Sequence, residues 1–296
     1  MSISRSVAFV TYDLAPALTA DDRLAAAALE ERGVSVDPVV WSDPGVDWRR
    51  FECVVLRSTW DYHRRVAEFR AWLDALDASR VPVWNPVPLA RWNLDKRYLR
   101  ELATRGVPTV PTIWLERGAE PVIDELLGTH GWTDAVVKPV VAATAYRTVR
   151  IALDQPAAER ARLQEIVHAA LALDDAMLQP FVPEVHAEGE WSLIFFGGEF
   201  SHAVIKQPAT GDFRVQAEFG GTAVDTAAPA EVLAGARVVL DRVAEPWLYA
   251  RVDGVRSADA GFLLMELEML EPSLFLSLDR AAPTRLADAI LGRFAR

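Results

Sequence analysis

Residues 251–276 read RVDGVRSADAGFLLMELEMLEPSLFL, and this stretch decides how the rest of the chain is interpreted. It predicts two strands joined by a short polar turn that contains a glycine. Side chains along a strand point alternately to its two faces, so Arg251 and Asp253 are expected on one face of the first strand. One face of the second strand is expected to carry Leu264, Glu266, Glu268 and Leu270.

If the two strands pair with these faces aligned, one surface gathers three carboxylates and a guanidinium, those of Asp253, Glu266, Glu268 and Arg251. Carboxylates on the covered face of a strand cost free energy unless a cation neutralises them. Mg²⁺ is the expected cation, because it is a hard ion that binds a few carboxylates together with phosphate oxygens. The alternative is a glutamate face that is simply solvated, and this stretch alone leaves both interpretations open.

Length and charge limit the classes of protein to consider. A chain of 296 residues suits two or three compact lobes. Its formal net charge of −11 argues against a general surface for nucleic acid or anionic membranes. The single cysteine, Cys53, excludes a disulfide scaffold and a cysteine-rich metal site. Because neither a signal-peptide pattern nor a membrane-spanning apolar run is found, we expect a cytoplasmic protein without nucleic-acid or membrane partners.

The first part of the chain, residues 1–88, is expected to form a small open α/β domain. Strands are predicted at 7–10, 34–41, 53–56 and 81–84, and helices at 21–32 and 67–78. In such sheets ligands bind beyond the carboxyl ends of the strands. The polar and aromatic residues expected there to bind the substrate are Tyr12, Arg57, Asp61 and Tyr62. The alternatives are an ordinary loop at 57–63, or a structural ion pair between Arg57 and Asp61.

Two further lobes are expected after a link at 85–88, a central lobe at 89–176 and a C-terminal lobe at 177–296. A helix at 90–99 has Asn93 as its expected N-cap. The other predicted elements are strands at 132–139, 149–153 and 177–183, a hairpin at 190–206, and helices at 156–173, 231–243 and 284–294. A loop of small residues at 140–147 and a polar loop at 211–222 complete these lobes.

Six short motifs along residues 90–275 together resemble the ATP-grasp superfamily. They are Asn93-x-Asp95-Lys96, Val137-Lys138-Pro139, Gln179-Pro180-Phe181-Val182-Pro183, Asp212-Phe213-Arg214 to Gly220-Gly221, Arg251-x-Asp253 and Glu266-x-Glu268. The resemblance implies an α/β protein of ATP-grasp architecture, in which an N-terminal open α/β domain is followed by two α+β lobes that clasp ATP. It also implies a carboxylate–amine ligase that works through an acyl phosphate and releases ADP and phosphate.

The same resemblance assigns roles to individual residues. Those implied to hold ATP are Lys96, Lys138, Gln179, Phe181, Val182, Glu184, Glu190, Gly220 and Gly221. Asp253, Glu266 and Glu268 are implied to hold two Mg²⁺ ions, and the catalytic residues are Arg251, Lys138 and Arg214. Arg214 is also a candidate for orienting the substrate. The sequence departs from the family pattern where Ala142–Ala145 replace a glycine-rich lid, which predicts a less pliant loop, and where Glu268 replaces the usual asparagine.

The strings RSTWDYH and WNLDKRYL resemble a smaller group of the superfamily, which includes the O-ureido-D-serine cyclo-ligase of cycloserine biosynthesis. This resemblance implies a small amino-acid derivative as substrate and an intramolecular ligation. The alternatives are an intermolecular ligase of the dipeptide or glutathione type and a nucleotide-binding regulator without turnover. The acid, the nitrogen nucleophile and the oligomeric state stay open at this point, with a homodimer as one candidate.

Overall fold

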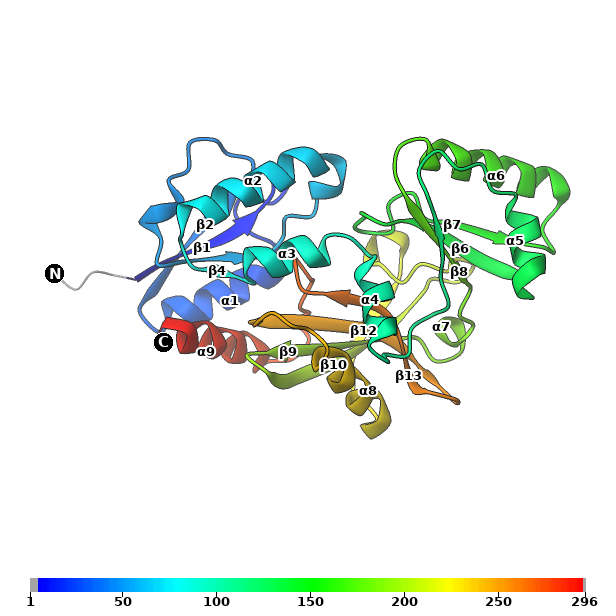
Figure 1. Ribbon diagram of the computed structural model, residues 1–296. Coiled ribbons are helices and arrows are strands. Elements are labelled where there is room, and N and C mark those ends of the chain that lie inside the picture. Colours follow the sequence, from blue (N-terminus) through cyan, green and yellow to red (C-terminus); the bar gives the residue numbers. More distant parts are fainter. Residues whose placement is uncertain (1–4, 295–296) are drawn as a thin grey trace.

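The N-terminal domain of this computed structural model, which describes residues 5–294, is an open parallel sheet between helices (Figure 1). Its strands are β1 (Arg5–Thr11), β2 (Val34–Val40), β3 (Cys53–Leu56) and β4 (Val83–Trp84), in the order β2-β1-β3-β4. The helices are α1 (Ala20–Glu30) and α2 (Val66–Ser79), with short 3₁₀ turns η1 (Trp48–Arg50) and η2 (Tyr62–Arg64). Alternate side chains of the fully buried β3 point to the two faces of the sheet, so Val55 packs with α1 on one face and Leu56 packs with α2 on the other. The predicted α/β domain is confirmed.

The central lobe is a four-stranded antiparallel sheet backed by helices. Its strands are β5 (Ile113–Leu115), β6 (Asp134–Pro139), β7 (Val149–Ala152) and β8 (Ala176–Pro180), in the order β5-β8-β6-β7. The helices α5 (Ile123–His130) and α6 (Ala157–Leu171) contribute Leu127 and Val167 to its core. Because β8 lies inside this sheet, the expected boundary at 176/177 falls at the start of a central-lobe strand.

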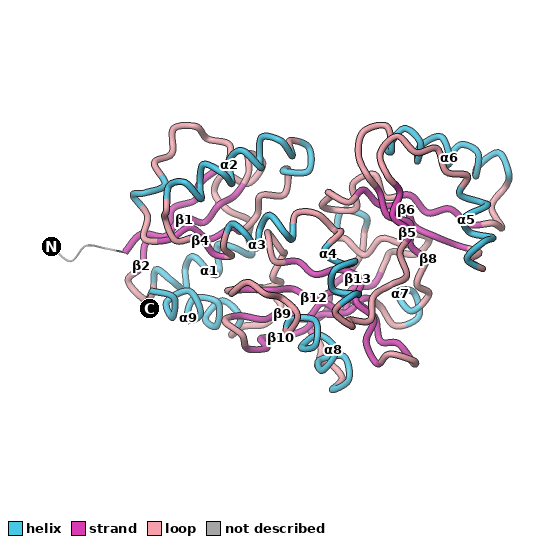
Figure 2. Tube along the Cα trace, viewed as in Figure 1, coloured by secondary structure: helices cyan, strands magenta, loops and turns pink. Residues whose placement is uncertain are grey.

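The C-terminal lobe is a five-stranded antiparallel sheet, which Figure 2 shows as the lowest group of strands. Its strands are β9 (Glu190–Phe196), β10 (Glu199–Gln207), β11 (Thr222–Asp225), β12 (Tyr249–Ser257) and β13 (Gly261–Glu268), in the order β11-β10-β9-β12-β13. Its helices are α7 (Glu184–Ala187), α8 (Ala230–Leu240) and α9 (Ala282–Phe294), with η3 (Ala217–Phe219). Within residues 5–294, no helix has the length and apolarity needed to cross a bilayer.

The two helices after the link lie differently from what the sequence suggested. α4 (Tyr98–Thr104) packs against the C-terminal sheet, where Leu99 and Leu102 share a core with Val252 and Leu267. α3 (Val87–Asn93) lies between two lobes, because its residue 89 joins that core while residues 87 and 90 join the core of the N-terminal domain. Asn93 is the last residue of α3 and not the expected N-cap of a helix. Its buried side-chain oxygen instead accepts hydrogen bonds from the backbone just beyond β13, from the Met269 and Leu270 N–H groups at 2.6 and 3.0 Å. That backbone has no neighbouring strand there to satisfy it, which explains why Asn93 is needed.

The strands β12 and β13 pair as a hairpin, and over its functional half the register aligns the two polar faces, which is the condition that the sequence analysis set. Arg251 lies opposite Glu268 and Asp253 opposite Glu266. Beyond that point a β-bulge pairs Gly254 with Leu264 and leaves Met265 as the extra residue. The expectation that Leu264 shares the face of Glu266 is therefore wrong, since the bulge turns Leu264 into the core with Leu267. The bulge confines the acidic face to the end of the hairpin.

Arg57 connects the N-terminal domain to the loop that follows β13. Its Nε donates to Asp22 Oδ1 at 2.9 Å, and its Nη2 donates to the Pro272 carbonyl at 3.0 Å. Both side chains of the ion pair are only 2% exposed. Asp21 adds two contacts to the same loop by accepting from the Leu276 and Ser277 N–H groups, each at 2.8 Å. Arg57 therefore neither pairs with Asp61 nor points to a substrate, and both sequence-based interpretations of it are wrong.

We predict that Arg57→Ala lowers the free energy of unfolding by about 3–5 kcal/mol, because it leaves Asp22 as an uncompensated buried charge. Urea unfolding measures the change. The control is Arg49→Ala, which removes an exposed pair with Asp47 and should cost less than about 1 kcal/mol. Equal effects of the two substitutions would contradict the structural role of Arg57.

Candidate active site

A cavity of about 420 Å³ lies between the central and C-terminal lobes, and the N-terminal domain closes one end of it through Trp60 and Tyr62. Most of the predicted site residues line it, namely Tyr62, Lys96, Lys138, Gln179, Phe181, Val182, Glu190, Arg214, Gly221, Arg251, Asp253, Glu266 and Glu268. Those that do not line it are Tyr12, Arg57, Asp61, Glu184 and Gly220. The structure thus brings residues from all three parts of the chain to one place, from the two antiparallel sheets and from the loop and turn after β3 of the N-terminal domain.

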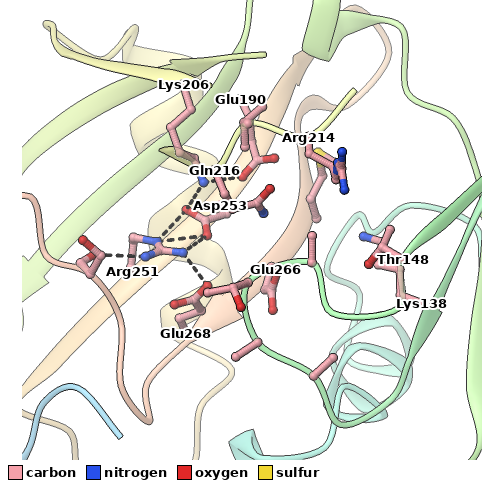
Figure 3. A pocket seen from close by; sticks show the side chains of 18 of the residues that line it. Lys138, Thr148, Glu190, Lys206, Arg214, Gln216, Arg251, Asp253, Glu266 and Glu268 are labelled. Atoms are coloured by element: carbon pink, nitrogen blue, oxygen red, sulfur yellow. Dashed lines mark hydrogen bonds and ion pairs between the residues drawn. The ribbon is translucent and has the colours of Figure 1, made fainter. Parts of the chain in front are cut away.

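The centre of the cavity is the acidic end of the hairpin, where Arg251 lies between Asp253 and Glu268 (Figure 3). Arg251 Nε donates to both Asp253 oxygens at 3.0 Å, and its Nη1 donates to the Ser273 carbonyl at 3.0 Å. Burial alone would lower the pKa of Arg251, but the charges of Asp253 and Glu268 outweigh it and raise the pKa. Burial, together with Glu266 and Asp253, raises the pKa of Glu268 to about 8.

Three lysines surround these acids. Lys96 Nζ lies 3.0 Å from Glu266 Oε1 and donates to the Ala142 carbonyl at 2.7 Å. Burial opposes the ionisation of Glu266, but the charges of Lys96 and Lys138 prevail and lower its pKa. Lys138 faces the acids from β6 of the opposite lobe, as Figure 3 shows, and burial lowers its pKa.

The third lysine, Lys206, was missed in the sequence. It lies 2.5 Å from Glu190 Oε1 and 3.5 Å from Asp253 Oδ1. Lys206 and Glu190 are direct partners across the β9–β10 hairpin. The sequence predicts this hairpin, but a regular register around Gly197-Gly198 would place Ile205 opposite Glu190. The β-bulge between Phe200 and His202 shifts the register by one and brings Lys206 there, and such a bulge has no signal in the sequence pattern.

The carboxylates have the chemistry that Mg²⁺ prefers, but they are not pre-arranged around a metal position. In residues 5–294 no three carboxylate, imidazole or thiol groups lie close enough to hold an ion. Arg251 and Lys96 explain this, since Arg251 binds Asp253 and Glu268 while Lys96 binds Glu266. The carboxylates are hard oxygen donors, and the lysines beside them can bind phosphate. This combination fits a metal ion that enters together with a nucleotide and replaces the ion pairs of the empty site. Glu266 and Glu268 are the more accessible donors, because Asp253 is 1% exposed.

The other end of the cavity is apolar and suits a flat base. Val136, Val185 and Met265 form its walls, next to Phe181 and Val182. The Phe181 N–H donates to the Asp134 carbonyl at 2.9 Å. Within the described part of the chain, the Phe181 carbonyl and the Val182 N–H have no hydrogen-bond partner. These two groups belong to one trans peptide unit and point to opposite sides, so one of them at a time can face the edge of a base.

Two loops cover the cavity. In the predicted lid, Ala142–Ala145 line the cavity, although Thr144 and Ala145 have left-handed φ values of 50° and 53°. In the polar loop, Arg214 forms a two-pronged pair with Asp212 and lies over the Phe219 ring at 3.6 Å. Gly221 is required there, since a Cβ would lie 2.2 Å from the Val215 carbonyl oxygen. Whether the alanines make the lid less pliant stays a prediction.

The N-terminal end of the cavity differs from the expected substrate site. Asp61 is held outside the cavity, because it accepts from Trp41 Nε1 at 2.7 Å and from Arg65 at 2.6 Å. Tyr12 packs against the outer side of Trp60 at a ring distance of 5.9 Å. Trp60 and Glu271, which the sequence analysis did not select, line the cavity with Tyr62. Glu271 belongs to the quoted stretch but lies beyond the strand, where the alternation rule gives no direction for its side chain.

Known proteins resemble the chain over nearly its whole length. The family described as D-cycloserine synthetase DcsG, N-terminal domain, matches residues 7–85. The cycloserine biosynthesis protein DcsG of Streptomyces lavendulae is 33% identical over 302 residues, which cover 96% of this chain and 94% of that protein. The crystal structure of D-cycloserine synthetase DcsG superimposes with a TM-score of 0.86 at 31% identity and covers 97% of this chain and 99% of that one.

More distant structures share the fold. The D-alanine–D-alanine ligase of Bacillus anthracis in complex with ATP has a TM-score of 0.68 at 16% identity, with 98% of this chain and 97% of that one covered. An ATP-grasp RimK domain protein from Sphaerobacter thermophilus has a TM-score of 0.69 at 19% identity, with 97% and 100% covered. At this level of identity the likeness concerns the fold alone, and it confirms the expected ATP-grasp architecture.

We predict that Glu271 lowers the free energy of unfolding of the empty protein, and that this effect grows as the pH rises. Burial raises the pKa of Glu271 from 4.5 to about 7, although Lys96 acts in the opposite direction. The folded state therefore binds the carboxyl proton of Glu271 more tightly than the unfolded chain does. The stability that comes from this proton is fully present below pH 4.5 and is lost as the pH rises through 7. Over this pH range the free energy of unfolding of Glu271→Gln should rise by up to about 3 kcal/mol relative to that of the wild type, as measured by urea unfolding. A constant difference between the two proteins would contradict this prediction.

Proposed function

The chain belongs to the DcsG family of ATP-grasp ligases, and on that basis we propose that it closes a small amino-acid derivative into a ring at the expense of ATP. We propose a substrate of the O-ureido-D-serine type, whose carboxylate and nitrogen nucleophile belong to one molecule. The observation that carries this proposal is the similarity to DcsG over nearly the whole length of both chains, together with a cavity that combines an apolar slot for a base, three lysines, two arginines and a row of acids.

We propose that ATP lies along the cavity between the two lobes. Its adenine would lie between Phe181, Val182 and Met265, with its edge against one of the two free backbone groups of the peptide unit between residues 181 and 182. Lys96 and Lys138 would then lie near the phosphates, where their charges offset those of the phosphate oxygens. Lys206 would hold Glu190 and Asp253 in place. Gly221 would allow the polar loop to approach the nucleotide closely.

We propose that Glu266, Glu268 and Asp253 hold Mg²⁺ when the nucleotide is present, with two ions as the finer expectation. The metal would supply electrostatic stabilisation of the transferring phosphoryl group. Arg251 would lose one or both carboxylate partners on that occasion, and its guanidinium would become available to the transferring group. The pair of Glu268 and Arg251 is thus proposed to keep the charges of the empty site balanced.

The proposed reaction has two steps. A substrate carboxylate oxygen attacks the γ-phosphorus, the bond from that phosphorus to the β,γ-bridging oxygen breaks, and ADP leaves. The nitrogen nucleophile then attacks the acyl carbon, phosphate leaves with the bonding electrons, and the nitrogen gives up its proton. Lys138, Arg251 and Arg214 are proposed to stabilise the charge on the transferring group. The loop 140–147 would exclude water, which would otherwise hydrolyse the acyl phosphate.

ADP release tests this function. The protein is incubated with ATP, Mg²⁺ and O-ureido-D-serine alone, and then with single small amino acids and pairs of them, with products identified by mass. Turnover with the single compound supports ring closure. Turnover only with pairs would establish the intermolecular alternative, and no ADP release in any combination would favour the regulator. A cytoplasmic location, a homodimer and the lack of nucleic-acid or membrane partners stay predictions.

We predict that Glu266→Gln lowers turnover by about 100-fold or more, because it removes a carboxylate that serves the metal and the phosphoryl group. The fold should persist, as judged by circular dichroism. Glu199→Gln, which removes an exposed carboxylate at the start of β10, is the control and should retain full turnover. If Glu266→Gln is fully active at saturating Mg²⁺, the metal assignment is wrong.

We predict that Lys138→Ala weakens ATP binding by about 10-fold to 100-fold, the usual effect of losing one charge-assisted hydrogen bond. Arg162→Ala removes one positive charge from an exposed position on α6 of the same lobe and is the control. Calorimetric titration with ATP and Mg²⁺ measures both. An unchanged affinity of Lys138→Ala would place the phosphates elsewhere in the cavity.

A further inference from the structure

Glu271 is distinguished from the other buried acids of the cavity by its partners. Each of the others lies within ion-pair distance of a cation: Glu190 of Lys206, Asp253 and Glu268 of Arg251, and Glu266 of Lys96. Glu271 is 8% exposed, and among residues 5–294 no cation lies within ion-pair distance of it. Its side-chain partner is the hydroxyl of Tyr62, which donates to it.

A buried carboxylate without a cation is costly when it is ionised. The fold nevertheless places this group on the wall of an open cavity, where a ligand reaches it. Trp60, Tyr62 and Phe275 line the same cavity, and aromatic faces attract organic cations. A carboxylate on a wall that also carries aromatic side chains is complementary to an ammonium group and unfavourable for a phosphate or a carboxylate. Lys96 also acts on Glu271, but its ammonium group is paired with Glu266 at 3.0 Å.

The position of Glu271 is fixed by the rest of the protein. Trp60 Nε1 donates to its backbone carbonyl at 2.9 Å, and Arg57 donates to the carbonyl of the next residue, Pro272. Two residues further on, the Ser273 carbonyl accepts from Arg251. The loop therefore joins Glu271 to the guanidinium at the reaction centre, so an ammonium bound to Glu271 fixes the place of the carboxylate in the same molecule.

We propose that Glu271 binds the α-ammonium group of the amino-acid substrate and, with Trp60 and Tyr62, determines specificity for an amino acid over a simple acid. This inference rests on the proposed function, since it names the subsite that takes the amino end of the substrate. It assigns substrate recognition to the loop after β13 and to η2, in place of the sequence-based set of Tyr12, Arg57 and Asp61.

The test compares two ligands that differ only in the ammonium group, O-ureido-D-serine and 3-(ureidooxy)propanoic acid. Calorimetric titration is done with the full chain, Mg²⁺ and a non-hydrolysable ATP analogue. The wild type should bind the amino compound about 10-fold to 100-fold more tightly. Glu271→Gln should lose this preference and keep its affinity for the ATP analogue. Glu218→Gln, which neutralises an exposed acid on the wall of the same cavity, should retain the preference.

Two outcomes would overturn the proposal: a preference that survives in Glu271→Gln, or a wild type that binds both compounds equally. If the wild type binds neither compound, the proposed substrate fails, and the same comparison is made with D-alanine and propanoic acid, which again differ by the ammonium group alone. A lack of preference with that pair as well overturns the role of Glu271. Should Glu271→Gln not fold, Glu271→Met removes the charge at a similar volume and takes its place.

Discussion

The bridge from Arg251 to Asp253 and Glu268 is the interaction on which the site depends. The register of β12 and β13 places three acids within one short stretch of sheet, and such a group is stable in a buried position only when cations balance it. The protein supplies these cations from different parts of the chain: Arg251 from the hairpin itself, Lys96 from the segment between α3 and α4, and Lys206 from β10. Charge balance in the cavity therefore depends on the folding of the C-terminal sheet and on the docking of the α3–α4 segment.

This arrangement links the empty and the loaded states. The guanidinium and ammonium groups that neutralise the acids in the free protein are the same groups proposed to meet phosphate once metal enters. Lys96 also donates to the Ala142 carbonyl, so the first part of the lid and the acidic row share one cation. A nucleotide that draws Lys96 away from Glu266 would at the same time act on the lid. Nucleotide binding and closure of the lid would thus both change the contacts of Lys96.

Local patterns in the sequence were sufficient for the elements and for the chemistry they carry directly. Strand alternation predicts that Arg251 and Asp253 share one face and that Glu266 and Glu268 share another, and the structure pairs these faces. Short motifs indicate Lys96, Lys138 and Arg214, which line the cavity. The errors concern residues whose partners are distant in the chain. Arg57 was interpreted with its neighbour Asp61, whereas its partner Asp22 is 35 positions away. Asn93 was taken as a cap, whereas it serves backbone 176 positions later. The bulge at Met265 and the loop of Glu271 have no periodic signal at all.

The contacts of Asp21 and Arg57 with residues 272–277 have a consequence for how relatives of this protein diverge. The loop that completes the cavity comes more than 200 positions later in the chain than the groups that hold it. An N-terminal domain exchanged by recombination would arrive with its own anchors for that loop, and a foreign pair of anchors would displace the loop even if the ATP-binding lobes were untouched. Exchange of whole domains is therefore a poor route to new substrates in this fold. Paired point substitutions in the loop 272–277 and in the residues that hold it are the more accessible route.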